Sequence, residues 1–508
     1  MKKKHFVRYL TLFALVLSVL SASLVAQAAT KDTLTIGAQA DANTMDPVGM
    51  ADGYSNTAGL LVYEGLLAMD DKGDVVPRLA ESYEQIDELT YRFTLRKGVT
   101  FHNGDPVTAD DIVYSMTRAL GPKGAMVHYQ NEGVESVEKK DENAIVIKLK
   151  HPFTAFLSEL TQSWGWVSSK KAIEEAEKNG GAYGTEPVGT GPYMLTAWRR
   201  GDRMTFSRFD GYHGKNAGIN QIILRAIPES NSRVIELQSS AVDIAWPIPA
   251  LSVRRVESDN KLSIVKKPNY VVFYMGFNCS KKPFDNPKVR EAIDLALDLE
   301  SIVKSVFRGE GQACFGALPP NAKYYDETYN KHEFNIEKAK ALLAEAGLPD
   351  GFKCEIWTND RQARIDTATI MQSQLKAIGI DIQLKVMESG AYWTELEKGT
   401  HDMYLVGYYS ATADFAPAMY STFHSSQNGI NTYTNYKNPE LDNLLEDANK
   451  TPDGKQRETI FKDIQRILAE GKTMLFMQVG ENVLGVNKNV KGFVPISTSE
   501  QDFSMVHY

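Results

Sequence analysis

Histidine and cysteine are the residues that most often mark a metal site or a nucleophilic enzyme, and their spacing here favours neither. The 9 histidines are dispersed so that no two stand three to five residues apart, which excludes HExxH and related metal spacings. The 3 cysteines form no CxxC pair, and GxSxG and GxxxxGK[ST] are absent. Only a site assembled from distant residues would leave a secreted hydrolase open.

The first 28 residues have the pattern of a cleavable signal peptide. Lysines at positions 2–4 and Arg8 precede an apolar run over residues 9–25, and Ala26-Gln27-Ala28 gives the small-x-small cleavage pattern. The run is near the shortest length that spans a membrane and contains three serines, so we expect cleavage rather than anchoring. No cysteine near the cleavage site can carry a lipid. We therefore expect a protein that is free in the bacterial periplasm.

Cysteine number limits the covalent cross-links in that compartment. Cys279, Cys314 and Cys354 allow at most one intramolecular disulfide, and the sequence does not tell which pair would form it. We expect buried, inert thiols instead.

Length and charge narrow the class of protein further. The 508 residues exceed one hydrophobic core, so we expect two or three domains of roughly 100–250 residues each. The net charge is −8, with no basic block beyond the signal peptide. This balance argues against nucleic acid and anionic membrane surfaces as partners.

The elements that must position any site change character along the chain. The first half favours strands, at Thr33–Ala38, 91–95, Ala144–Leu149, 204–209 and 221–227. In the second half, Asn286-Pro287, Asn335 and Pro439 each predict the start of a helix, and another helix ends at Gly379. Strands are predicted over 380–386 and Met403–Tyr409.

This alternation of helices and strands predicts a largely parallel sheet covered by helices. Ligands bind such sheets at the carboxyl ends of the strands. The residues just after Tyr409 are therefore expected in a binding position.

One long segment and several short ones carry a family resemblance. They are LAESY at 79–83, YRFTLRKGVTFHNGDPVTADD at 91–111, MDP at 45–47, VYEGL at 62–66, GTGPY at 189–193, PFD at 283–285, VREAI at 289–293, AKALLAEAGLPDG at 339–351 and QLKAIG at 374–379. The sequence resembles the family 5 extracellular solute-binding proteins, the peptide, nickel and glutathione group that serves ABC importers. The resemblance covers residues 30 to 508 and is strongest for dipeptide-binding and glutathione-binding members.

The resemblance implies an α/β fold of the periplasmic binding protein type, a "Venus flytrap" with two ligand-binding lobes and an extra domain. After the signal peptide at 1–28, lobe I would comprise residues 29–75, 196–284 and 479–508. Domain II would be 76–195, and lobe III 285–478.

The resemblance also suggests residues that hold the two ends of a peptide. Asp414, in GYYSATADF at 407–415, matches the aspartate that receives a peptide α-ammonium in relatives, although the proline-rich stretch that often follows it is missing. An Asx turn is the alternative. Arg361 and Arg364 lie where dipeptide binders place the arginine for the ligand carboxylate. We favour Arg361, and a solvated position at a helix start is the alternative for the other.

Aromatic side chains are expected to wall the pocket. Tyr54, with its neighbour Ser55, is expected to face the cleft, and Tyr408 and Tyr409 stand where relatives often carry tryptophan. Trp393 and Trp246 lie in segments near the site, with core packing as an equal alternative for each.

The sequence thus predicts a monomeric periplasmic protein that captures short peptides, including dipeptides, tripeptides or glutathione, and delivers them to an ABC permease in the inner membrane. It predicts no catalysis, cofactor or metal. Nickel or metal-chelate binding and oligosaccharide binding by the same fold stay open, as do a secreted hydrolase and a chaperone-like role.

Overall fold

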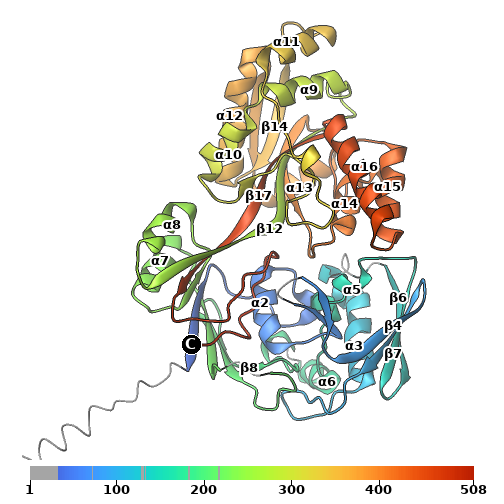
Figure 1. Ribbon diagram of the computed structural model, residues 1–508, viewed down its shortest axis with the longest axis vertical. Helices are drawn as coiled ribbons and strands as arrows, with labels where there is room; N and C mark the ends of the chain where they lie inside the picture. Colours follow the sequence, from blue (N-terminus) through green and yellow to red (C-terminus); the bar gives the residue numbers. More distant parts are fainter. Residues whose placement is uncertain (1–31, 71–72, 128–130, 132, 181–182, 216–217) are drawn as a thin grey trace, which may run out of the picture.

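A computed structural model of the chain describes residues 32–70, 73–127, 131, 133–180, 183–215 and 218–508. The predicted signal peptide lies outside these residues. The names lobe I, domain II and lobe III are kept below for the residue ranges given above. Figure 1 shows lobe III above, lobe I and domain II below, and two long strands connecting them.

One mixed sheet of 11 strands runs through both lobes in the described part of the chain. Its order is β15 (Asp381–Met387), β14 (Lys353–Asn359), β16 (Met403–Tyr409), β12 (Leu262–Phe277), β17 (Met474–Asn487), β11 (Ile244–Trp246), β1 (Thr33–Ala38), β10 (Gln221–Ala226), β9 (Arg203–Arg208) and β8 (Tyr193–Arg199), with β13 (Gln312–Ala313) paired to β17.

The two long strands β12 and β17 form the connection between the lobes. They pair antiparallel, and the register shifts between Pro268 and Val272, where the chain passes from one lobe to the other. Tyr270 lies inside this irregularity, and its N–H donates to the carbonyl of Ser497 at 3.0 Å. The predicted boundary at 284/285 therefore falls beyond the end of β12, and the domain boundaries stay predictions.

The sheet of lobe III is less parallel than the sequence pattern predicted. β14 pairs parallel with β15 and β16, but β16 and β17 both run antiparallel to β12. The reason is that β12 leads from lobe I into lobe III while β17 leads back. Parallel strands β14 and β16 still end on the same side, as the binding-position argument requires.

Helices cover this sheet. Lobe III contains α9 (Pro287–Ala296), α10 (Leu299–Phe307), α11 (Ile336–Glu345), α12 (Gln362–Leu375), α13 (Ser389–Glu397), α14 (Ala416–Phe423), α15 (Pro439–Lys450) and α16 (Lys455–Gly471). Lobe I contains α2 (Gly53–Val62), α7 (Ser230–Gln238) and α8 (Ala250–Glu257).

The predicted helix signals are confirmed. Asn286, Asn335 and Asn438 cap α9, α11 and α15 by accepting backbone N–H bonds, and α9 and α15 begin with a proline. After α12 a short 3-10 turn ends at Gly379, which takes the left-handed φ of +80°.

Domain II is built on its own four-stranded antiparallel sheet. Its order is β4 (Ala80–Asp87), β5 (Thr90–Leu95), β7 (Ala144–Leu149) and β6 (Val134–Asp141). The helices α3 (Ala109–Leu120), α5 (Phe156–Glu159) and α6 (Lys170–Lys178) accompany it, and a hairpin of β2 (Leu67–Met69) and β3 (Val75–Pro77) joins it to lobe I. Thr108 and Asp111 form a capping box at the start of α3.

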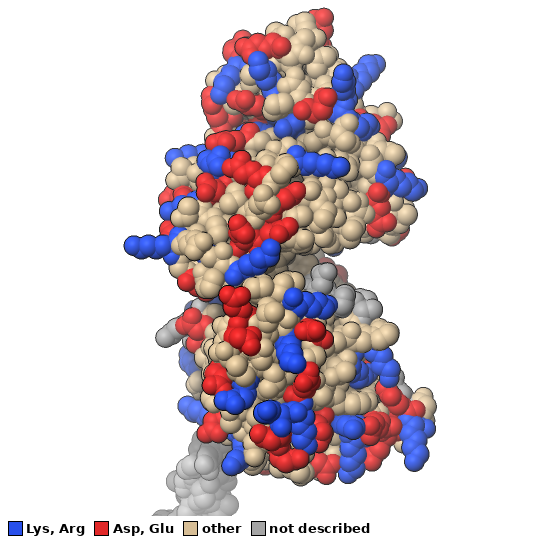
Figure 2. Space-filling model, turned by 90° about the vertical axis from the view of Figure 1, so that its right-hand side faces the viewer, with Lys and Arg blue, Asp and Glu red and all other residues tan. Residues whose placement is uncertain are grey.

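The surface carries charges of both signs. On the face shown in Figure 2, Lys and Arg alternate with Asp and Glu over both halves of the molecule, which narrows between them. Among the described residues, no helix is both long enough and apolar enough to cross a membrane.

Candidate functional site

A cavity of about 490 Å³ lies where lobe I, domain II and lobe III meet. Lobe I contributes the face of α2 and the C-terminal segment after β17, with Asn56, Leu60, Thr498 and Glu500. Domain II contributes residues 161–163, and lobe III contributes Ala411. This volume lies in the range of small-molecule sites.

The position of Ala411 agrees with the expectation from strand direction. Ala411 follows the carboxyl end of β16, and the side-chain amide of Gln162 donates to its carbonyl at 3.5 Å. Tyr270, at the crossover of β12, also lines the cavity, and its ring meets Phe415 edge-on at 5.6 Å. Residues after Tyr409 thus reach the cavity, as predicted.

A buried carboxylate at the cavity wall is fully engaged by protein groups. The hydroxyls of Thr190 and Tyr212 donate to Glu64 at 3.0 Å and 2.9 Å, and His213 Nε2 lies 2.8 Å from the same carboxylate. Arg78 Nε is 3.9 Å away. Burial, followed by the charge of Glu64, raises the pKa of Tyr212, so its phenol stays a donor. Glu64 therefore fastens lobe I to the chain entering β8 and β9.

Two other charges in the cavity have no such partners. Glu500 forms no ion pair among the described residues, and its only printed side-chain donor is Ser499 Oγ at 3.3 Å. Burial raises the pKa of Glu500. Lys267 on β12 also lines the cavity and, within the described chain, has no acidic partner.

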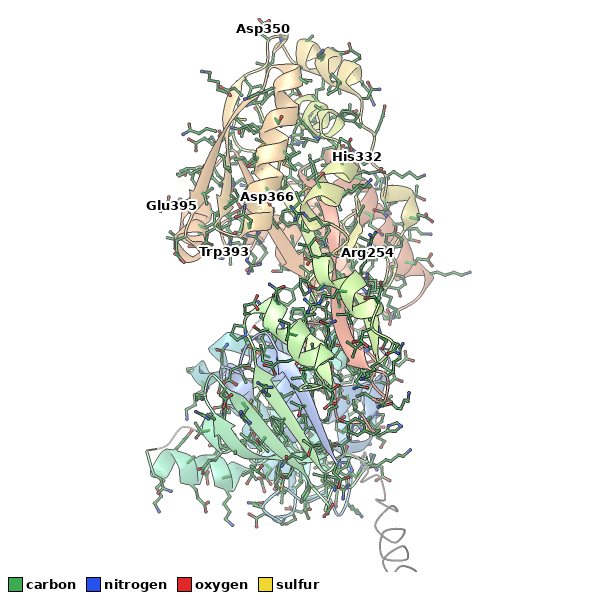
Figure 3. The ribbon with its side chains drawn as sticks, turned by 90° about the vertical axis from the view of Figure 1, so that its left-hand side faces the viewer. Arg254, His332, Asp350, Asp366, Trp393 and Glu395 are labelled. Atoms are coloured by element: carbon green, nitrogen blue, oxygen red, sulfur yellow. The ribbon has the colours of Figure 1, made fainter. Side chains whose placement is uncertain are left out.

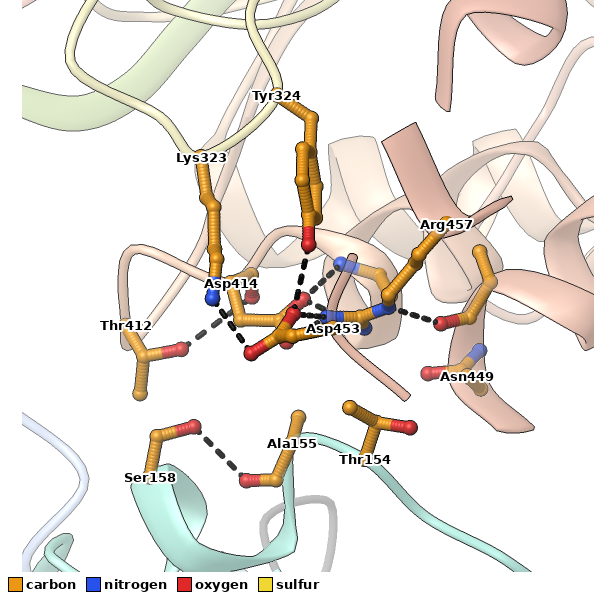
Figure 4. A network of polar contacts seen from close by, with 12 residues as sticks. Thr154, Ala155, Ser158, Lys323, Tyr324, Thr412, Asp414, Asn449, Asp453 and Arg457 are labelled. Atoms are coloured by element: carbon orange, nitrogen blue, oxygen red, sulfur yellow. Dashed lines mark hydrogen bonds and ion pairs between the residues drawn. The ribbon is translucent and has the colours of Figure 1, made fainter. Parts of the chain in front are cut away.

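Beside the cavity, domain II touches lobe III directly (Figure 4). The Thr154 N–H donates to the carbonyl of Asn449 at 2.8 Å, and its hydroxyl donates to the carbonyl of Thr451 at 2.9 Å. Glu159 of α5 is only 6% exposed here. Burial and the negative charge of Asp414 raise the pKa of Glu159 to about 8, so its carboxyl is protonated at neutral pH.

Asp414 lies at this contact and is already paired. Arg457 Nη1 is 2.7 Å from Asp414 Oδ2 and Nη2 is 3.0 Å from Oδ1, a bidentate ion pair (Figure 4). Arg457 is fully buried and also lies 2.9 Å from Asp453. Asp414 Oδ1 further accepts from the Ala416 N–H at 3.1 Å, at the start of α14. Its role toward a ligand stays a prediction, and this internal partner is what a ligand ammonium would have to share.

The two arginine candidates differ in environment. Arg361 is exposed at the N-cap of α12. Arg364 is 8% exposed, and its Nη1 is buried with no hydrogen-bond partner among the described residues. Burial lowers the pKa of Arg364, which lies near Tyr392 and Tyr274. A buried guanidinium N–H without an acceptor is costly, so Arg364 is the arginine that lacks a partner.

The aromatic candidates divide between the lobes. In lobe I, the rings of Tyr54 and Trp246 lie 4.9 Å apart, and Trp246 is buried. Ser55 is also buried, where its hydroxyl donates to Asp52 at 2.6 Å and accepts from the Asn43 N–H at 2.9 Å. Ser55 thus holds the loop before α2.

In lobe III, neighbouring tyrosines take opposite positions because side chains alternate along β16. Tyr408 is buried, donates its hydroxyl to the carbonyl of Ala317 and packs on Tyr274 and Phe423. Tyr409 is 54% exposed. Trp393 on α13, 37% exposed, lies at the end of lobe III that faces lobe I (Figure 3), with its ring 6.1 Å from Tyr433.

The structure therefore does not gather the nine predicted residues around the cavity: none of them lines it. Tyr54 and Trp246 stand together in lobe I, and the others lie in lobe III apart from Ser55. The cavity residues that sequence reasoning missed are Gln162, Lys267, Tyr270 and Glu500. The irregular C-terminal segment has no periodic pattern, so only its tertiary position could identify Glu500.

Thiols and metals add nothing to the site. All 3 cysteines are free, and burial raises the pKa of Cys314 to about 11 and that of Cys354 to about 12. Buried unpaired thiols are confirmed for these two, while Cys279 is partly exposed. The described residues contain no group of three or more His, Cys, Asp or Glu placed to hold a metal ion.

Two lobes that share two strands, with a ligand-sized cavity where they meet, define a two-lobed solute-binding protein. The chain belongs to the bacterial extracellular solute-binding proteins, family 5, whose central region matches residues 74–430. It is the substrate-binding protein of an ABC transporter in the peptide and nickel family, and it is not an enzyme.

Relatives and solved structures agree with this assignment. The chain is 31% identical over 501 residues to the glutathione-binding protein GsiB of Salmonella choleraesuis, covering 96% of both chains. It superposes on the periplasmic binding protein DppA of Helicobacter pylori in complex with the peptide STSA with a TM-score of 0.78 and 27% identity, covering 94% of this chain and 98% of that one. NikZ of Campylobacter jejuni in complex with Ni(L-His) gives a TM-score of 0.76 at 25% identity, over 91% and 96%.

Proposed function

We propose that this protein captures short peptides, with glutathione among them, in the cavity between its lobes and delivers them to an ABC permease in the inner membrane. The observation that carries this proposal is the cavity of about 490 Å³, which presents charged and amide side chains over an otherwise aromatic and aliphatic wall. Peptides need such a mixture, because their backbone and termini require polar partners while their side chains bury apolar surface. The relatives named for glutathione and for a peptide support the same class of ligand.

Capture works by closure of the lobes around the β12–β17 connection. A ligand that touches both lobes favours the closed state by its difference in affinity for the two states. The residues proposed from the sequence, Asp414 and Arg364, lie on lobe III, and the cavity is formed mostly by lobe I and domain II. We expect the protein to act as a monomer in the periplasm.

The test is thermal unfolding of the mature protein after unfolding and refolding to remove any carried ligand. The panel contains glutathione, dipeptides, tripeptides, oligosaccharides and nickel–histidine. A ligand at 100 times its dissociation constant adds about 2.7 kcal/mol to the free energy of unfolding, which raises the midpoint visibly. We expect stabilisation by glutathione or another short peptide. Stabilisation by sugars alone would refute the peptide proposal and keep the family assignment.

Nickel-chelate binding is the second candidate, favoured by the likeness to the nickel-binding NikZ structure. The described residues offer no ligand cluster for a bare metal ion, so a chelate that brings its own ligands is the form to test. Stabilisation by nickel–histidine, with none by glutathione or peptides, would select this candidate.

A further inference from the structure

The cavity contains one carboxylate and one ammonium that have no partner of opposite charge in the described chain, Glu500 and Lys267. The other wall carboxylate described above, Glu64, already receives three donors. A charge that is partly buried without a counter-charge is unfavourable in the empty protein and becomes favourable when a ligand supplies the missing charge.

A rigid framework connects these two residues. Lys267 of β12 pairs in register with Asn482 of β17. The side-chain amide of Asn482 donates to the carbonyls of Ile496 and Thr498, at 2.8 Å and 2.7 Å, and so fixes the loop that leads to Glu500.

Further bonds hold this loop from other sides. The Tyr270 N–H donates to the Ser497 carbonyl at 3.0 Å, and the Asn321 side chain of lobe III donates to Ser497 Oγ at 3.1 Å. On the far side of Glu500, the Gln501 N–H donates to Thr57 Oγ1 of α2 at 3.0 Å. Both charges are therefore positioned before any ligand arrives, which reduces the entropy lost on binding.

We propose that Glu500 and Lys267 bind the ammonium and a carboxylate of a zwitterionic ligand, and that this pair restricts the cavity to amino-acid-derived solutes. The proposal rests on the proposed function, because it specifies how the same cavity recognises its peptide. Neither residue was among those suggested by the family resemblance. A ligand with two carboxylates, such as glutathione, has a second anionic group left for the unpartnered Arg364.

The strand geometry supplies matched controls. Lys266 precedes Lys267 on β12 but points to the opposite face, is exposed and lies 3.9 Å from Glu481. Neither Lys266 nor Glu481 lines the cavity. Lys266→Met and Glu481→Gln therefore change the same charges on the same strand pair without changing the cavity.

The experiment is isothermal titration calorimetry of the refolded mature protein with glutathione and with trialanine, each also as the N-acetylated and the C-terminally amidated form. Glu500→Gln is expected to weaken binding of the free-amine peptides by about 30-fold or more, and Lys267→Met to do the same for the free carboxylates. N-acetylation should weaken wild-type binding strongly but change little in Glu500→Gln, and amidation should behave likewise for Lys267→Met. The two control variants should bind as wild type does.

The outcomes separate this inference from the proposed function. If wild type binds a peptide and either cavity variant binds it as tightly, the charge-pair inference is wrong and the proposed function stands. If wild type binds neither peptide, both fail. Thermal unfolding of each ligand-free variant shows that it is folded, and Glu500→Asp provides a second carboxylate variant that should keep part of the affinity if Glu500→Gln does not fold.

Discussion

Asp414 and Arg457, 43 residues apart in sequence, form a bidentate ion pair in which the guanidinium is fully buried. Arg457 also donates its Nε–H to the carbonyl of Ala448 at 2.8 Å, at the end of α15. The pair thereby connects the segment after β16 to both α15 and α16. This arrangement gives the carboxylate of Asp414 a structural role within lobe III that exists before any ligand binds.

Asp414→Ala is expected to lower the free energy of unfolding by about 3–5 kcal/mol, because it leaves the buried Arg457 with the single, half-exposed partner Asp453. Urea unfolding of the ligand-free protein measures this loss. Asp453→Ala is the matched control, expected to cost about 0–1 kcal/mol as an exposed pair.

If Asp414 also receives a ligand ammonium, Asp414→Ala will weaken peptide binding beyond what partial unfolding explains, at a temperature where the variant is folded. Undiminished affinity of the folded fraction would leave Asp414 with the structural role alone. Equal losses of stability in Asp414→Ala and Asp453→Ala would contradict the buried-pair argument.

Arg364→Met is expected to leave the ligand-free protein at least as stable as wild type. The guanidinium Nη1 is buried without an acceptor, and an apolar side chain of similar length removes that cost. Thermal unfolding without ligand measures it, and Arg361→Met, at an exposed position, should be neutral. A loss of several kcal/mol in Arg364→Met would mean that the guanidinium has a stabilising partner.

The same two variants compare the arginines as ligand residues. We expect Arg364→Met to weaken binding of a peptide with a free carboxylate and Arg361→Met to leave it unchanged. The reverse result would restore the preference for Arg361 drawn from the sequence.

Tyr408→Phe and Tyr409→Phe test the alternation along β16. Removing the buried hydroxyl of Tyr408 leaves the Ala317 carbonyl without its donor and should cost about 1–3 kcal/mol. The same change at the exposed Tyr409 should stay within about 0.5 kcal/mol. Urea unfolding distinguishes the two, and equal effects would place Tyr408 outside the core.

Much of the fold could be predicted because its signals are local. Met403–Tyr409 forms a strand with the predicted bounds, and Asn286, Asn335 and Gly379 begin or end helices where capping chemistry placed them. The mixed direction of the lobe III sheet could not be predicted, because it depends on β12 and β17 crossing between lobes that are separated by about 200 residues of chain.

The site was harder to predict because its contacts are not local. Nothing in the sequence around Asp414 shows that Arg457 pairs with it, and Glu500 stands in a segment without motif or periodicity. Period-2 alternation, in contrast, could have separated Tyr408 from Tyr409, since only one of two neighbours on a strand can face the core.

Glu159 gives the last prediction, a dependence of stability on pH. Burial and Asp414 raise the pKa of its carboxyl from 4.5 to about 8 in the folded protein. Between these values the folded state keeps the proton while the unfolded state has released it, so the unfolded state binds fewer protons. The free energy of unfolding must therefore fall as the pH rises through this window, at a rate of at most about 1.4 kcal/mol per pH unit from this group.

Glu159→Gln mimics the protonated carboxyl and should remove this contribution. Urea unfolding of both proteins at pH 5, 6, 7 and 8 measures it: their stabilities should differ least at pH 5, and the variant should be the more stable at pH 8. Glu174→Gln, an exposed change on α6 of the same domain, should follow wild type throughout. Parallel curves for wild type and Glu159→Gln would show that the carboxyl titrates alike in the folded and unfolded states. The contact of α5 with Asp414 would then be open to water rather than closed.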